Sequence, residues 1–154
     1  MEEKKELSYD EAREKALRLL EFRSHSEAEL AKKLFRAGAR RDDMERLIAY
    51  LREYGLLDDK EYAGRLAKDL VNLKKFGHFR VRAELKNRGI SDEYINEAMA
   101  ELEGEETDML LPLVEKKLGG NFERKNIEKA VRYFSYRGYS YDDIKQCIDR
   151  LKEE

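Results

Sequence analysis

The sequence predicts an all-α protein, folded as an elongated tandem array of three three-helix modules. Three observations support this prediction: apolar residues recur at helical spacing, helix start and stop signals alternate along the chain, and one pattern recurs about every 50 residues. The chain has 154 residues, of which 43% are charged and 41% hydrophobic. This composition is too apolar for a disordered tail and too charged for a membrane protein.

Helix starts are marked by short polar residues that can cap the first turn. Ser8–Glu11 and Ser26–Glu29 both fit the capping box, in which Ser and Glu satisfy the free backbone amides reciprocally. Further N-caps are expected at Asp58, Ser91, Asn121 and Ser140. Helix stops are expected at glycines in the left-handed conformation, since glycine lacks the Cβ that disfavours a positive φ. These glycines are Gly38, Gly55, Gly77, Gly89, Gly104, Gly119, Gly120 and Gly138.

Three longer helices are predicted over residues 9–22, 59–76 and 108–118. In the second of these helices, one apolar face is formed by Tyr62, Leu66, Leu70 and Leu73, which are three or four residues apart. The single proline, Pro112, falls within the third helix. Proline lacks a backbone donor, so Pro112 marks either a first turn or a kink.

A repeat organises the whole chain. Gly38, Gly89 and Gly138 are 51 and 49 residues apart, and each is flanked by apolar residues four positions before it and six, ten and thirteen positions after it. The last three offsets lie on one helical face. The flanking residues are Leu34, Met44, Ile48 and Leu51, then Leu85, Ile95, Met99 and Leu102, then Phe134, Ile144, Ile148 and Leu151. The predicted modules are therefore 1–57, 58–104 and 105–154. A single compact helical globule is the alternative.

Positive charge is concentrated in the middle module. Residues 65–89 hold eight basic and two acidic side chains, a local balance of +6 in a chain whose net charge is −2. Such a segment suits an anionic partner, either a polyanion or an acidic protein groove, although solvated helix faces carry similar stripes. The candidate binding residues in this segment are Arg65, Lys68, Lys75, Arg80, Arg82, Lys86 and Arg88.

A second cluster, Arg132–Tyr141, interleaves arginine with aromatic residues. Arg132 and Arg137 are further candidate binding residues, because arginine and tyrosine together can stack on nucleic-acid bases. The alternative is that the tyrosines of this cluster pack helix junctions with their hydroxyl groups directed outward.

No catalytic, metal or membrane motif is present in the sequence. It contains no glycine-rich phosphate loop, and its one cysteine, Cys147, excludes an internal disulfide and a cysteine-rich zinc site. Cys147 follows the apolar pattern and is expected to be a small buried hydrophobic residue. We therefore expect a protein that is not an enzyme, has no cofactor or metal, has no membrane segment, and is located in the cytoplasm.

Four segments resemble the RecX family of bacterial recombinase regulators. They are Ser26–Leu34, Gly55–Ala63, Gly77–Ile90 and Arg137–Ile144, and they occur in the family's order over nearly the whole chain. Two departures are His78-Phe79, where the family more usually has a small or proline-containing turn, and Pro112, in a helix that is commonly unbroken.

The resemblance implies a regulator that binds RecA-type recombinase filaments on DNA and modulates their ATP hydrolysis and strand exchange, most often by inhibition. We also expect a monomer whose contact with single- or double-stranded DNA is weak or made only through the filament. Two other functions stay open: an autonomous DNA-binding protein of the helix-turn-helix kind, and a helical scaffold for another protein.

Overall fold

The computed structural model describes residues 5–154, apart from the side chains of residues 106 and 107. Over this range the chain forms helices joined by short turns and contains no strand. The helices are α1 (Tyr9–Phe22), α2 (Glu27–Ala37), α3 (Arg41–Glu53), α4 (Asp59–Asn72), α5 (His78–Asn87), α6 (Asp92–Glu101), α7 (Glu105–Leu118), α8 (Arg124–Tyr136) and α9 (Tyr141–Glu153).

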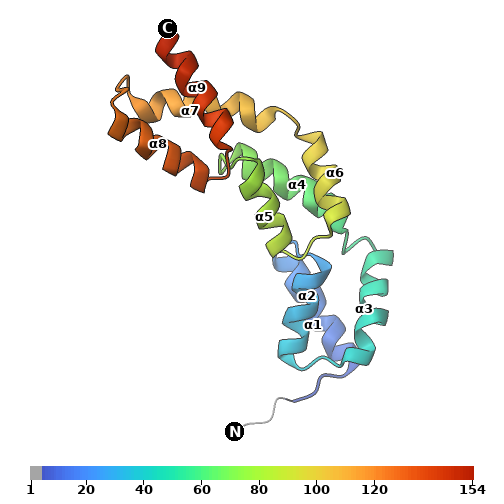
Figure 1. Ribbon diagram of the computed structural model, residues 1–154. Coiled ribbons are helices and arrows are strands. Elements are labelled where there is room, and N and C mark those ends of the chain that lie inside the picture. The colour runs from blue at the N-terminus through green and yellow to red at the C-terminus, as the bar shows by residue number, and fades with distance from the viewer. Residues whose placement is uncertain (1–4) are drawn as a thin grey trace.

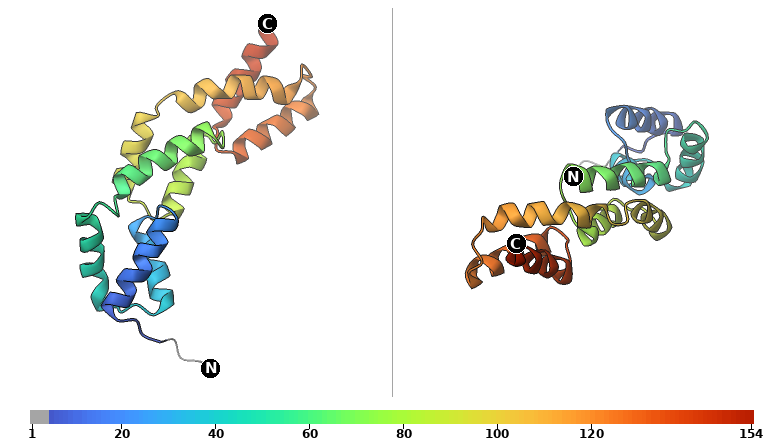
Figure 2. Two further views of the ribbon diagram at one scale, coloured as in Figure 1. Left: turned by 180° about the vertical axis from the view of Figure 1, so that it is seen from behind. Right: turned by 90° about the horizontal axis from the view of Figure 1, so that it is seen from above.

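The helices form three groups that follow one another along a curved, elongated body (Figure 1). We name these groups the first repeat (α1–α3), the middle repeat (α4–α6) and the third repeat (α7–α9). The most extensive helix contacts join helices of the same repeat, and each repeat has its own cluster of buried side chains. The views from behind and from above show the same succession (Figure 2). The predicted elongated array is thus confirmed, and an intermixed globular core is excluded.

The glycine-centred repeat corresponds to one turn geometry used three times. Gly38, Gly89 and Gly138 have φ values of 108°, 77° and 103°, which a residue with a Cβ adopts only with strain. Each glycine separates the second and third helices of its repeat. The apolar positions before and after them are buried in all three repeats, except that Leu151 is only partly buried. The sequence pattern therefore identified the core of each repeat.

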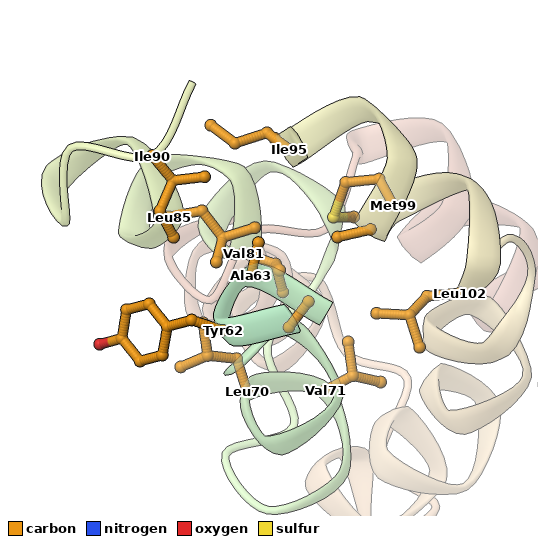
Figure 3. Packing of buried hydrophobic residues seen from close by; sticks show 12 residues of the cluster. Tyr62, Ala63, Leu70, Val71, Val81, Leu85, Ile90, Ile95, Met99 and Leu102 are labelled. Carbon is orange, nitrogen blue, oxygen red and sulfur yellow. The ribbon is translucent and has the colours of Figure 1, made fainter. Parts of the chain in front are cut away.

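The middle repeat shows how such a core is assembled (Figure 3). Val71 from α4, Val81 and Leu85 from α5, and Leu102 after α6 are all almost fully inaccessible to water. The Tyr62 ring lies at the edge of this cluster with its hydroxyl group directed away from it. The cluster also takes a partly buried contact from Met109 of α7. The predicted boundaries at 57/58 and 104/105 stay a prediction, since one side chain of the third repeat packs on the middle core.

Most of the predicted caps are present. Ser8 and Ser26 each form a complete capping box, and the side chains of Asp58, Ser91 and Ser140 accept hydrogen bonds from the third residue of their helices. The prediction for Asn121 is wrong, because α8 begins after Glu123. The Asn121 side chain instead accepts a hydrogen bond from the Glu123 amide at 2.9 Å and shapes the preceding turn.

Gly77 does not have the predicted role. Its φ is −85°, and it is the N-cap of α5 rather than a left-handed helix stop. A Cβ at Gly77 would lie 2.6 Å from the carbonyl carbon of Gly138, closer than real Cβ contacts. Gly77 is therefore required by close packing between the middle and third repeats.

The turn after α4 also differs from the prediction. The helix ends at Asn72 rather than at residue 76, so Leu73 leaves the apolar face and is 74% exposed. Lys75 takes the left-handed conformation, with a φ of 58°, in the turn where a glycine was expected to end the helix. Pro112 lies well inside α7 with its ring exposed, so it does not mark a first turn.

Candidate interaction surface

The cations of α4 lie on a surface of mixed charge. Arg65 and Lys68 are exposed and line an open depression of about 470 Å³. Lys60 adds a third cation to this depression, but three acids, Asp58, Glu61 and Glu101, line it as well. Arg65 also lies 3.7 Å from Glu61 and donates a hydrogen bond to the Ser24 hydroxyl at 2.6 Å. Local acids therefore offset much of the positive charge that the sequence predicted here.

Arg88 belongs to the junction between the first and middle repeats. Its Nη1 lies 3.4 Å from the carboxylate of Glu29 and donates a hydrogen bond to the Tyr62 hydroxyl at 3.4 Å. The Tyr62 hydroxyl in turn donates to Glu29 Oε1 at 3.2 Å. The Arg88 carbonyl accepts a hydrogen bond from the Ser26 hydroxyl. Arg88 thus holds two repeats together.

Electrostatics favour the charged form of Glu29 at this junction. Partial burial by itself raises the pKa of Glu29. The hydrogen bond from the Ser26 backbone, the charge of Arg88 and the hydrogen bond from Tyr62 all lower it, and together they leave the pKa below its ordinary value. Glu29 is therefore ionised at neutral pH, and its negative charge offsets the positive charges of Arg23 and Arg88.

Arg80 and Arg137 occupy the junction between the middle and third repeats. The Arg80 guanidinium lies 4.5 Å from the ring centroid of Phe76 and 5.2 Å from that of Tyr136, and it donates to the Tyr136 carbonyl at 3.3 Å. The Arg137 guanidinium lies 5.0 Å from the Phe76 centroid and donates to the Lys74 carbonyl. Both side chains lie over Phe76, and each also donates a hydrogen bond to a backbone carbonyl across the junction. Arg80 Nε is further paired with Glu84 of its own helix at 3.0 Å.

Backbone hydrogen bonds fix the same junction. The Gly77 amide donates to the Arg137 carbonyl at 2.8 Å, and the Phe79 amide donates to the Gly138 carbonyl at 3.0 Å. The first turn of α5 thereby uses free helix amides to bind the turn between α8 and α9. This arrangement limits the relative movement of the middle and third repeats.

Lys86, Arg132 and Arg82 lie outside the two junctions between repeats. Lys86 and Arg132 are exposed, and neither side chain forms an ion pair or hydrogen bond among the described residues. Arg82 is half-buried, donates to His78 Nε2 at 3.0 Å and to Asn96 Oδ1 at 2.8 Å, and lines a small depression with them. The structure therefore does not gather the nine predicted cations into one patch.

Lys75 lies in a separate pocket between the middle and third repeats, which we name the junction pocket. Its volume is about 390 Å³. It is lined by Lys75, Leu113, Lys116, Lys117, Tyr133, Phe134 and Arg137. The sequence analysis missed Lys116 and Lys117, although residues 116–137 hold seven basic and two acidic side chains. Counting basic and acidic residues over 116–137, as for 65–89, would have identified both lysines.

The tyrosines divide between the two expected roles. Tyr139 is buried and donates a hydrogen bond to the Lys75 carbonyl at 3.0 Å. Tyr136 and Tyr141 are exposed. The ring of Tyr133 is approached by two cations, with Lys117 Nζ 4.2 Å and Arg137 Cζ 5.6 Å from its centroid. Tyr139 therefore has the expected packing role, and Tyr133 has it in part.

Cys147 is half-buried against the core of the third repeat. Burial, reinforced by the charge of Asp143, raises the pKa of its thiol. This environment disfavours the reactive thiolate and fits the prediction of a packing residue. Among the residues that the structure describes, no helix is long and apolar enough to cross a membrane.

Comparison with known proteins gives a consistent result. Family models described as the first and second three-helix domains of RecX match residues 12–51 and 58–99. The chain is 35% identical over 153 residues to the regulatory protein RecX of Salmonella paratyphi A, with 90% of both chains covered. It is 33% identical over 149 residues to that of Clostridioides difficile, covering 93% of this chain and 69% of the relative.

Solved structures agree on the fold. The crystal structure of RecX from Lactobacillus salivarius superposes with a TM-score of 0.84 at 22% identity, covering 95% of this chain and 97% of the other. A second crystal structure of a regulatory protein RecX gives a TM-score of 0.78 at 21% identity, covering 92% of this chain and 73% of the other. With the sequence relatives at 33–35% identity over nine-tenths of this chain, these findings show that the chain belongs to the RecX family of regulatory proteins.

Proposed function

We propose that this protein binds RecA-type recombinase filaments assembled on DNA and inhibits their ATP hydrolysis and strand exchange. Membership of the RecX family supports a regulatory role, and the elongated array supports a filament as the partner. The observation that carries the proposal is the succession of three repeats joined through specific contacts at both junctions (Figure 1). An extended, braced body of this kind can contact more than one subunit of a polymer at once.

The mechanism follows from multivalency. Each repeat offers a modest surface, and the junctions hold the surfaces at fixed separations. When one repeat binds a filament subunit, the others are presented to neighbouring subunits at high effective concentration. A body that bridges subunits hinders the movements that turnover and strand exchange require.

At the residue level we propose Lys68, Lys86 and Arg132 as the first contacts with the anionic partner, since these side chains are exposed. Arg65 is exposed but already contacts Glu61 and Ser24. Arg82 is half-buried. Both are proposed as further contacts. Arg80, Arg88 and Arg137 act mainly by holding the repeats in place. We also propose repeat boundaries at 57/58 and 104/105, and a monomer in the cytoplasm that meets DNA chiefly through the filament.

The proposal is tested by titrating the protein into a cognate RecA-type recombinase hydrolysing ATP on single-stranded DNA. We expect hydrolysis to fall at amounts well below one protein per recombinase subunit, because each array blocks more than one subunit. Unchanged hydrolysis at stoichiometric amounts would favour the scaffold function instead.

An autonomous DNA-binding function makes a different prediction. Binding to naked DNA through lysine and arginine weakens steeply as the salt concentration rises, because releasing condensed counterions into a more concentrated solution gains less entropy. Electrophoretic shifts of duplex and single-stranded DNA at 50 and 200 mM salt separate the two functions. Tight binding to naked DNA at 50 mM salt that weakens steeply at 200 mM, together with unaltered recombinase activity, would favour the autonomous function.

A further inference from the structure

The junction pocket differs in charge from the other surface depressions that contain predicted cations. It is lined by four cationic side chains and by no carboxylate among the residues that the structure describes. The depression beside Arg65 holds three acids, and the one beside Arg82 holds Glu103. The junction pocket is therefore the place where positive charge converges without local compensation.

The pocket is built from two repeats. Lys75 comes from the turn after α4, Leu113, Lys116 and Lys117 come from α7, and Tyr133 and Phe134 come from α8. Arg137 adds a cation next to the Phe76 ring and is anchored to the Lys74 carbonyl. The backbone hydrogen bonds of Gly77 and Phe79 hold the two sides of the pocket in register.

Lys75 occupies its place at an energetic cost. It is the one non-glycine residue with a positive φ among those the structure describes, and a side chain with a Cβ is strained there. The Lys75 carbonyl accepts the hydrogen bond from buried Tyr139, which holds this turn in place. Glycine would fit the turn with less strain, so the lysine contributes something that the fold does not require.

The lining favours a protein segment over a nucleic-acid base. Half-buried Leu113 and the Tyr133 ring, which is 42% exposed, provide the accessible apolar surface beside the four cations, because Phe134 is almost fully buried. Lys117 and Arg137 both lie over the Tyr133 ring, which leaves this ring poorly placed to stack on a base. Cations around an apolar surface match carboxylates that flank an aliphatic or aromatic side chain.

We propose that the junction pocket binds an acidic peptide segment of a partner protein, with Lys75, Lys116 and Lys117 pairing with its carboxylates. An apolar side chain of the segment packs on Leu113 and the exposed part of the Tyr133 ring. The inference rests on the proposed function only in taking the partner to be a protein. Occupation of the pocket bridges the middle and third repeats and stiffens the array.

The test uses the full chain and a fluorescein-labelled twelve-residue peptide that alternates pairs of Asp or Glu with single Leu residues. Fluorescence anisotropy at low salt measures its affinity for the wild type, K75G, K116Q and the matched control K145Q, whose lysine is exposed on α9 outside the pocket. The expected affinity loss is roughly two- to fivefold for K75G and for K116Q. No loss is expected for K145Q.

K75G gives a second readout that a purely structural lysine would not show. Because glycine relieves the strained backbone, the thermal midpoint should rise by about 1–4 °C while the peptide affinity falls. Wild-type affinity in both K75G and K116Q overturns the proposal. It is also overturned if a Gln- and Asn-substituted peptide binds equally well, or if an oligothymidylate competes at lower concentration than the unlabelled acidic peptide.

The outcome is separable from that of the proposed function, because the peptide assay contains no recombinase. If the protein binds the peptide but does not affect ATP hydrolysis, the pocket is a peptide-binding site and the recombinase is not the partner. If the protein inhibits ATP hydrolysis but does not bind the peptide, the proposed function is retained and the pocket is rejected as a peptide-binding site.

Discussion

The guanidinium of Arg88 lies 3.4 Å from the carboxylate of Glu29, and this contact joins the first and middle repeats. Glu29 lies in the first turn of α2 and Arg88 follows α5, 59 positions later in the chain. Glu29 also accepts a hydrogen bond from Tyr62 and lies 3.6 Å from Arg23. A carboxylate with only 14% of its side chain exposed is therefore the centre of a polar network between two repeats.

Removing the charge of Glu29 should destabilise this junction. We expect E29Q to lower the free energy of unfolding by about 1–3 kcal/mol, because Arg88 loses its ionic partner in a partly buried site. Urea denaturation followed by circular dichroism measures the change. The control is E45Q, since Glu45 is exposed on α3 and should be nearly neutral.

The Glu29 effect should also depend on pH. The pKa of Glu29 is lowered in the folded protein from its ordinary value of 4.5, so its stabilising contribution is present above pH 4.5. That contribution is lost as the pH falls through the folded-state pKa. The stability difference between wild type and E29Q should shrink over this interval, and a constant difference down to pH 3 would contradict the argument.

A methyl group at Gly138 should disturb the junction between the middle and third repeats. Gly138 has a φ of 103°, and a Cβ there would overlap the backbone nitrogen and Cβ of Arg80. We expect G138A to cost about 1–3 kcal/mol for the backbone conformation, with a further loss from displaced α5. The control G55A has a φ of 70° but open space around it, so it bears only the conformational cost. Equal losses in the two variants would show that close packing at Gly138 contributes nothing.

His25 should make the first repeat less stable in mild acid. It is buried, its Nδ1 lies 2.9 Å from the Arg23 carbonyl, and its Nε2 lies 2.8 Å from Lys33 Nζ. Nδ1–H therefore donates to the carbonyl, and Nε2 accepts from the ammonium group, which requires a neutral ring. Burial lowers the pKa of His25 from its ordinary value of 6.5, and the charges of Lys33 and Arg23 lower it further, outweighing the Arg23 hydrogen bond and the charge of Glu29.

The sign of the pH effect follows from this depressed pKa. As the pH falls below 6.5, the unfolded chain binds a proton before the folded chain does, so stability is full above pH 6.5 and decreases below it. Urea midpoints at pH 7.5 and 5.5 measure the decrease. H25Q cannot titrate at this position and should show a smaller decrease. An identical pH dependence in the two proteins would exclude His25 as the cause.

Lys68 and Lys86 should contribute to filament binding without supporting the fold. Both side chains are exposed, and an exposed ion pair contributes about 0.2–1 kcal/mol. The double variant K68Q/K86Q should therefore bind a recombinase filament roughly two- to thirtyfold more weakly at low salt, with an unchanged urea midpoint. The matched control is K145Q/K152Q, which removes two exposed lysines of α9. Equal affinity of the two double variants in a filament co-sedimentation assay would remove Lys68 and Lys86 from the interface.

The sequence by itself determined the helices, most of their caps and the threefold repeat. These features depend on local or periodic chemistry: capping boxes at Ser8 and Ser26, glycine at positive φ in Gly38 and Gly89, and apolar residues at helical spacing. Such signals act within one helix or one turn, so they can be recognised from neighbouring residues alone. The end of α4 was misplaced because the left-handed conformation at its C-terminal turn is taken by Lys75 rather than by a glycine.

The tertiary structure decided the role of each charge. Arg80, Arg88 and Lys86 look alike in the sequence, yet Arg80 and Arg88 are engaged at junctions with residues 56 and 59 positions away, and Lys86 is exposed. The junction pocket likewise joins Lys75 to Lys116 and Lys117 from the next repeat. Whether a cation is neutralised or available depends on which distant side chains the packing of the repeats brings within a few ångströms, and helical periodicity carries no information about that distance.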